Sequence, residues 1–116
     1  MNTLEKKMVE ILTDLRDNYG VTEVKAEFES EGTRLNELMR LKDIASHCRV
    51  GIVLKIGGPE AIRDIHDARL IGVSGIVAPM VESPYALQKF LEAIAKYVPE
   101  DERDDLAFAV NVETYQ

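Results

Sequence analysis

Charged side chains alternate with apolar ones in three short segments of the sequence. Within residues 23–29 every second position is apolar, and the alternate positions carry Glu23, Lys25, Glu27 and Glu29. Lys55 has the same phase in a second apolar segment, and Asn111 and Glu113 have it in a third. Carboxylates can exchange protons or bind cations, and an ammonium group can hold an anion. The chemistry open to these groups therefore depends on the elements that carry them.

The alternation predicts β-strands with two different faces. Four segments have strand character, over residues 21–29, 50–56, 73–79 and 106–112. Helical spacing of apolar residues predicts helices over residues 2–20, 33–48, 59–72 and 83–98. Strands that alternate with single helices imply right-handed crossovers and a parallel sheet, so the predicted fold class is α/β.

Residues that are typical of helix ends support this division of the chain. Asn2 with Glu5 forms a plausible capping pair at the start of the first helix. Pro59 and Pro84 are expected in the first turns of their helices, where the missing N–H of proline costs nothing. The acidic run over residues 99–105 is expected to be a solvated loop.

The charged faces of the strands have two explanations, which the pattern leaves open. In an open two-layer sheet the charges would simply lie in water, although parallel sheets are seldom left bare. In a (β/α)₈ barrel of the TIM type they would point inward, towards a catalytic mouth at the carboxyl ends of the strands. In both cases we expect the side chains on this face to pair by charge, namely Lys25, Glu27, Lys55 and Glu113.

Composition limits the kind of partner. The chain has 116 residues, 46% of them hydrophobic, and a formal charge of −7, which suits one small domain and argues against nucleic acid and anionic membrane surfaces. The single cysteine, Cys48, cannot form an intrachain disulfide, and the charged start lacks the apolar run of a signal peptide. No stretch approaches the roughly 20 consecutive apolar residues of a membrane span. We expect a cytoplasmic protein.

Two motifs in order carry a resemblance to a known family. The stretches "APMVES" at residues 78–83 and "NVET" at residues 111–114, with the helix and strand before the first of them, resemble the aldolase and citrate lyase family (HpcH/HpaI type) of phosphoenolpyruvate/pyruvate-binding barrels. The resemblance implies that the four strands correspond to the second through fifth of the family barrel. Residues 1–116 would then form one partial (β/α)-barrel domain that lacks the first and last strands.

The resemblance also implies a metal. The family glutamate that binds a catalytic Mg²⁺ or Mn²⁺ falls on Glu113, and the second family ligand would lie beyond residue 116. At the end of the third family strand an arginine commonly binds the substrate. This chain has Lys55 at that position, which keeps the positive charge but lacks the planar guanidinium group that can form two parallel hydrogen bonds.

The remaining expected roles concern proton transfer and substrate contact. The family histidine after the second strand is missing here, and Glu27 or Glu29 would take the acid/base role in its place. Pro79 and Met80, in the "APMVES" turn, would contact the substrate with Lys55.

The expected function is that of a metal-dependent carbon–carbon lyase or aldolase-like protein acting on a small anionic oxo-acid or acyl-CoA-type substrate. The chain would be either a homo-oligomer or part of a longer protein. The alternative is a non-catalytic half-barrel or flavodoxin-like module that binds a partner or an anionic ligand. The missing histidine and arginine favour the module, and the intact "NVET" favours the enzyme.

Overall fold

The protein is an α/β structure in which helices and strands alternate along the chain. The computed structural model describes residues 1–29 and 31–114. Its elements are, in order, α1 (Thr3–Tyr19), β1 (Glu23–Glu27), α2 (Leu35–His47), β2 (Gly51–Lys55), α3 (Ile62–Ile71), β3 (Gly75–Ala78), α4 (Pro84–Tyr97), α5 (Glu100–Arg103) and β4 (Ala107–Val110). None of the described helices combines the length and the apolar character needed to cross a membrane.

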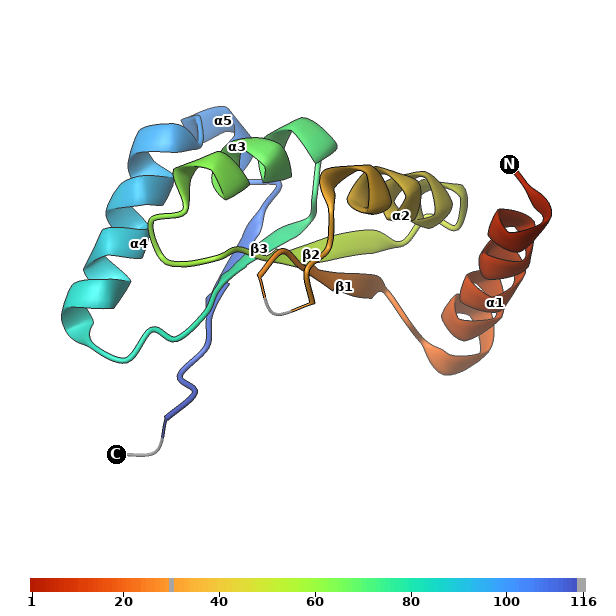
Figure 1. The fold of residues 1–116 in the computed structure, drawn as a ribbon, viewed down its shortest axis with the longest axis horizontal. Coiled ribbons are helices and arrows are strands. Elements are labelled where there is room, and N and C mark those ends of the chain that lie inside the picture. The colour runs from red at the N-terminus through yellow and green to blue at the C-terminus, as the bar shows by residue number, and fades with distance from the viewer. Residues whose placement is uncertain (30, 115–116) are drawn as a thin grey trace.

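The four strands form one parallel sheet in the order β1-β2-β3-β4, as the sequence predicts. Since each strand follows its neighbour along the chain, every crossover carries a helix and all carboxyl ends lie at one edge of the sheet. In Figure 1 helices α2, α3 and α4 form a row along one face, and α1 stands beyond the β1 edge.

Local signals explain where the first and fourth helices begin. The Asn2 side chain accepts a hydrogen bond from the Glu5 amide at 2.8 Å, and the Glu5 carboxylate accepts one from the Asn2 amide, which completes a capping box. Ser83 caps α4 by accepting from the Ala86 amide, and Pro84 occupies the first turn. The predictions for Asn2, Glu5 and Pro84 are confirmed.

Two predictions about local structure are wrong. Pro59 does not lie in a helical turn, because α3 begins only at Ile62; the preceding residues form a turn in which the Gly57 amide donates to Asp64 Oδ2 at 2.8 Å. The acidic run over residues 99–105 contains the one-turn helix α5 in place of a simple loop. A bidentate ion pair between Arg69 of α3 and Glu102 of α5, at 2.8 and 3.1 Å, holds it against the protein.

The hydrophobic core lies between the sheet and the row of helices. Its fully buried side chains include Leu54 and Ile76 from the strands and Leu38, Ile65 and Phe90 from the helices. On the opposite face the side chains of β4 are exposed at alternate positions. Among the described residues no helix covers that face, so the charged face of the sheet has no second layer over it.

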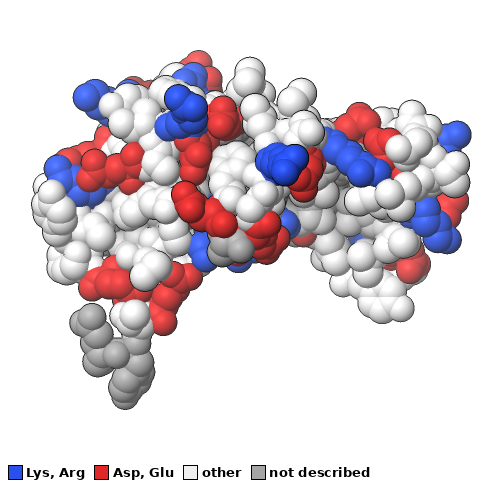
Figure 2. All heavy atoms as spheres, in the orientation of Figure 1, with Lys and Arg blue, Asp and Glu red and all other residues white. Residues whose placement is uncertain are grey.

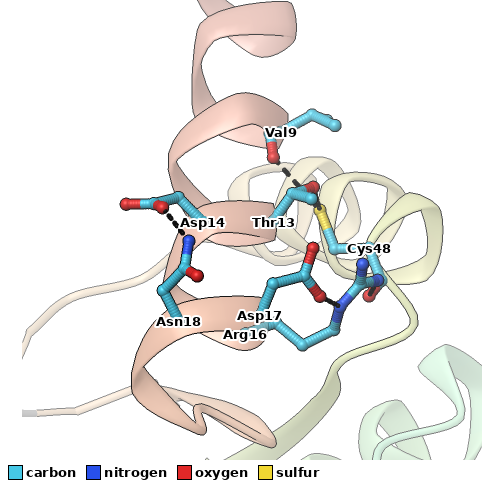
Figure 3. Close-up of polar contacts among 7 residues, drawn as sticks. All are labelled: Val9, Thr13, Asp14, Arg16, Asp17, Asn18 and Cys48. Carbon is cyan, nitrogen blue, oxygen red and sulfur yellow. Dashed lines mark hydrogen bonds and ion pairs between the residues drawn. The ribbon is translucent and has the colours of Figure 1, made fainter.

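Helix α1 is fixed to α2 through Cys48, which is fully buried. Figure 3 shows the backbone carbonyl of Val9 and the side chains of Thr13 and Arg16 directed towards this residue. Thr13 Oγ1 donates to Cys48 Sγ and the thiol donates to the Val9 carbonyl, both at 3.5 Å, while the Arg16 guanidinium donates to the Cys48 carbonyl. One flank of α1 therefore packs against the C-terminal end of α2.

Candidate functional site

Four charged residues meet on the open face of the sheet, where the strands end. Glu27 and Lys55 are the last residues of β1 and β2 and lie opposite each other in the register, and Glu113 follows the end of β4 by three residues. Lys55 Nζ lies 3.1 Å from Glu113 Oε1 and 4.0 Å from Glu27 Oε1, and Lys25 Nζ lies 2.7 Å from the same Glu27 oxygen. The predicted pairing on one face is confirmed.

Burial within this cluster is uneven. The side chains of Glu27 and Lys55 are 11% and 14% exposed, whereas that of Lys25 is 52% exposed. A charge held away from water needs an opposite charge nearby, and Glu27 and Lys55 provide this for each other. Hydrogen bonding to Glu27 raises the pKa of Lys25 above its ordinary 10.5, and the nearby carboxylates of Glu31 and Glu113 act in the same direction.

Glu82 holds the segment that carries Glu113. One of its carboxylate oxygens accepts hydrogen bonds from the amides of Glu113 and Thr114 at 2.7 and 3.2 Å, and the other accepts from the Thr114 hydroxyl at 2.6 Å. These bonds, that of the hydroxyl first, lower the pKa of Glu82 below its ordinary 4.5. No role for Glu82 was expected from the sequence, although this residue lies within the "APMVES" motif.

A cavity of about 290 Å³ opens beside the cluster. Its lining includes all six residues expected at the site: Glu27, Glu29, Lys55, Pro79, Met80 and Glu113. Met80 has a φ of 50°, a left-handed conformation that a residue with a long side chain rarely adopts, and its side chain is 62% exposed at the rim. The structure thus brings the expected residues together; it does not test their roles.

A second cavity, of about 560 Å³, lies next to the first between the β2–α3 turn and the start of α4. Glu29 borders both cavities, and the second is also lined by Asp64, Tyr85 and Lys89. Lys89 Nζ lies 5.3 Å from the centre of the Tyr85 ring, within range of a cation–π contact. Sequence reasoning missed this hollow, because it forms between segments that share no motif.

The cluster supplies part of what a divalent cation needs. Glu113 offers carboxylate oxygens, the ligand type that Mg²⁺ and Mn²⁺ prefer, but one of these oxygens is paired with Lys55. Within residues 1–29 and 31–114 no three His, Cys, Asp or Glu side chains are grouped so that they could hold an ion together. The donor chemistry of Glu113 fits a hard cation, and Lys55 competes with that cation for it.

The space-filling view shows acidic side chains gathered where the segment after β4 leaves the sheet (Figure 2). Glu82 and Glu113 lie in this segment and in the turn that holds it. Comparison with protein-family models, with curated proteins and with solved structures finds no match for the chain.

Proposed function

We propose that this chain is a partial (β/α) barrel that forms the mouth of a metal-dependent carbon–carbon lyase of the aldolase and citrate lyase type. Its substrate would be a small oxo-acid or acyl-CoA-type anion. The observation that carries the proposal is the convergence of Glu27, Lys55 and Glu113 at the carboxyl ends of parallel strands, on the face without helices. In parallel α/β folds this end of the sheet is where ligands bind and catalytic side chains gather.

Each residue has a chemical role in this proposal. Lys55 lines the cavity and pairs with Glu27 and Glu113. Its ammonium group would bind the carboxylate of the substrate. Glu27 or Glu29 would move the proton that bond cleavage requires, since both border the cavity. Pro79 and Met80 would form the apolar wall that orients the substrate.

Glu113 would be the carboxylate ligand of the divalent cation, and Glu82 would position it by holding its backbone. When bound, such an ion polarises a carbonyl and stabilises negative charge that develops on its oxygen. Because Lys55 pairs with the same oxygen, substrate binding would draw Lys55 away from Glu113 and release the carboxylate for the ion.

The test is a titration of the 116-residue chain with Mn²⁺ by calorimetry, with Mg²⁺ as the second ion. We expect Glu113→Gln, which keeps the shape and removes the charge, to weaken binding by about tenfold or more. Glu100→Gln is the matched control, since Glu100 is an exposed carboxylate in α5, which precedes β4, whereas Glu113 follows the other end of that strand. Equal affinities for the wild type and Glu113→Gln would reject the metal role.

A binding module without catalysis is the second candidate, favoured by one observation. The charges of the cluster are satisfied by one another, so it is stable without metal or substrate. In that case an oxo-acid such as pyruvate would bind with the same affinity with and without Mn²⁺. Metal-enhanced binding of pyruvate would favour the lyase.

A further inference from the structure

The described sheet has two free edges, β1 and β4, and each carries unpaired backbone groups on its outer side. Along β4 the core-facing side chains Phe108 and Val110 are only half buried, and Ala107 and Ala109 on the other face are exposed. Edges of this kind tend to pair with another strand.

Helix α1 extends an apolar surface beside the β1 edge. Its Val9, Thr13 and Arg16 flank is occupied by α2, and residues three and four apart form a second, apolar flank. This second flank carries Leu4, Met8, Ile11 and Leu15. Met8 packs against the small core cluster between α1 and α2, whereas Leu4 and Ile11 are 58% and 52% exposed.

A groove of about 200 Å³ runs between this flank and the core. It is lined by apolar side chains from three elements: Met8, Ile11, Leu12 and Leu15 of α1, Val24 of β1, and Leu41 and Ile44 of α2. The groove therefore lies on the helix side of the sheet, next to the free β1 edge.

Helix α4, at the other end of the row, carries a matching apolar flank. Lys89, Ala93 and Tyr97 share a cavity with Ile62 of α3, so they mark the flank that faces α3. On the opposite flank Leu87 and Leu91 point away from α3 and are 39% and 56% exposed.

We propose that two copies of this chain close an eight-stranded parallel barrel, in which β4 of each copy pairs with β1 of the other. The proposal rests on the partial barrel of the proposed function and names what completes it. Four parallel strands are half of the eight that close a barrel, and a two-fold axis along the barrel turns both junctions into the same contact. At each junction α1 lies where the helix between β4 of one copy and β1 of the other belongs.

The two edges are complementary in shape and charge. Phe108 and Val110 of one copy would enter the groove beneath α1 of the other, and Leu87 and Leu91 would meet the exposed flank of α1. On the inner face, the exposed ammonium of Lys25 at the β1 edge would lie beside the exposed carboxylate of Glu113 at the β4 end. The closed mouth would then carry two sets of the Lys55 and Glu113 pair.

Analytical ultracentrifugation of the full chain tests the closure, with no metal or substrate present. We expect a species of twice the chain mass of 13.0 kDa. Leu91→Glu and, separately, Ile11→Glu place a charge in both junctions and should raise the dissociation constant by about a hundredfold or more. Because both side chains are more than half exposed in the single chain, circular dichroism should show that each variant still folds.

The matched control is Leu70→Glu, at a residue 79% exposed on α3, which lies inside the row of helices and so at neither junction. The control should remain dimeric. Because Cys48 is fully buried and thus shielded from the reagent, it can be kept, and a short bismaleimide should link Ile11→Cys of one chain to Leu91→Cys of another in a mixture of the two variants. A monomeric wild type, open-ended oligomers, or equal effects of Leu91→Glu and Leu70→Glu would overturn the closure. Glu113→Gln removes one ion pair on the inner face and leaves the apolar flanks of both junctions unchanged. The metal titration can therefore fail while the dimer persists, and the dimer can be absent while the metal binds.

Discussion

Replacing Lys55 with methionine tests whether the charge cluster stabilises the fold. Methionine is similar in length and keeps the apolar stem of the lysine in place, so the substitution removes chiefly the ammonium group. Lys55 is 14% exposed in its side chain and contacts both Glu27 and Glu113. The variant therefore leaves two carboxylates without their least exposed cation.

The expected cost follows from what each carboxylate keeps. Removing one partner of a fully buried ion pair costs about 3–5 kcal/mol. Here Glu27 keeps Lys25 at 2.7 Å, and Glu113, 35% exposed, can be solvated by water. The variant is also relieved of the desolvation of the ammonium group, so we expect a loss of about 1–2 kcal/mol in the free energy of unfolding. For a domain of this size that lowers the melting temperature by roughly 4–8 °C.

Urea unfolding followed by circular dichroism measures this loss, with Lys25→Met as the matched control. Lys25 is 52% exposed and its pairing is screened by solvent, so its removal should have a smaller effect. High salt should reduce the Lys25 contribution more than that of Lys55. If Lys55→Met were as stable as the wild type or more so, the desolvation penalty would outweigh the pairing and the reasoning would be wrong.

Two further predictions concern the segment after β4 and the docking of α1. Because hydrogen bonds lower the folded pKa of Glu82, their stabilisation is present above the ordinary 4.5 and is lost as the pH falls through the lowered value; the Thr114 amide signal should titrate below pH 4.5 in NMR, and not in Glu82→Gln. Leu12→Ala should cost about 2–3 kcal/mol in urea unfolding, since Leu12 is 7% exposed between α1 and α2, while Met39→Ala, at a residue 57% exposed, should change stability by less than about 0.5 kcal/mol.

The regular elements and the shared charged face could be predicted from the sequence because their signals are local. The period of two in β1 places Lys25 and Glu27 on one face, and the parallel arrangement then brings Lys55 beside Glu27. The Asn2 cap likewise acts over three residues. Each of these features depends on neighbours in the chain or on one general rule of parallel sheets.

The anchoring of the site could not be predicted in the same way. Glu82 reaches Glu113 across 31 residues, and the contact exists because the β3–α4 turn and the segment after β4 leave the sheet side by side. The strand was expected to continue through residue 112, but β4 ends at Val110. The backbone carbonyl of Asn111 instead accepts a hydrogen bond at 2.8 Å from the amide of Val81, in the turn after β3. Such contacts depend on turn geometry, for which no periodic pattern exists.

Exposed apolar side chains alone do not argue for a partner, since Leu70 is more exposed than any residue of the proposed junctions and stands apart from them. Closure would instead join continuous apolar surfaces. Met8, Ile11 and Leu15 border an apolar groove beside an unpaired strand edge, and Leu87 and Leu91 lie at the opposite end of the same row of helices. A single chain leaves both surfaces in water, whereas one two-fold contact buries both of them and pairs both edges. The same contact would cover the open face of the sheet, where the buried Glu27 and Lys55 already have the low exposure expected of a barrel interior.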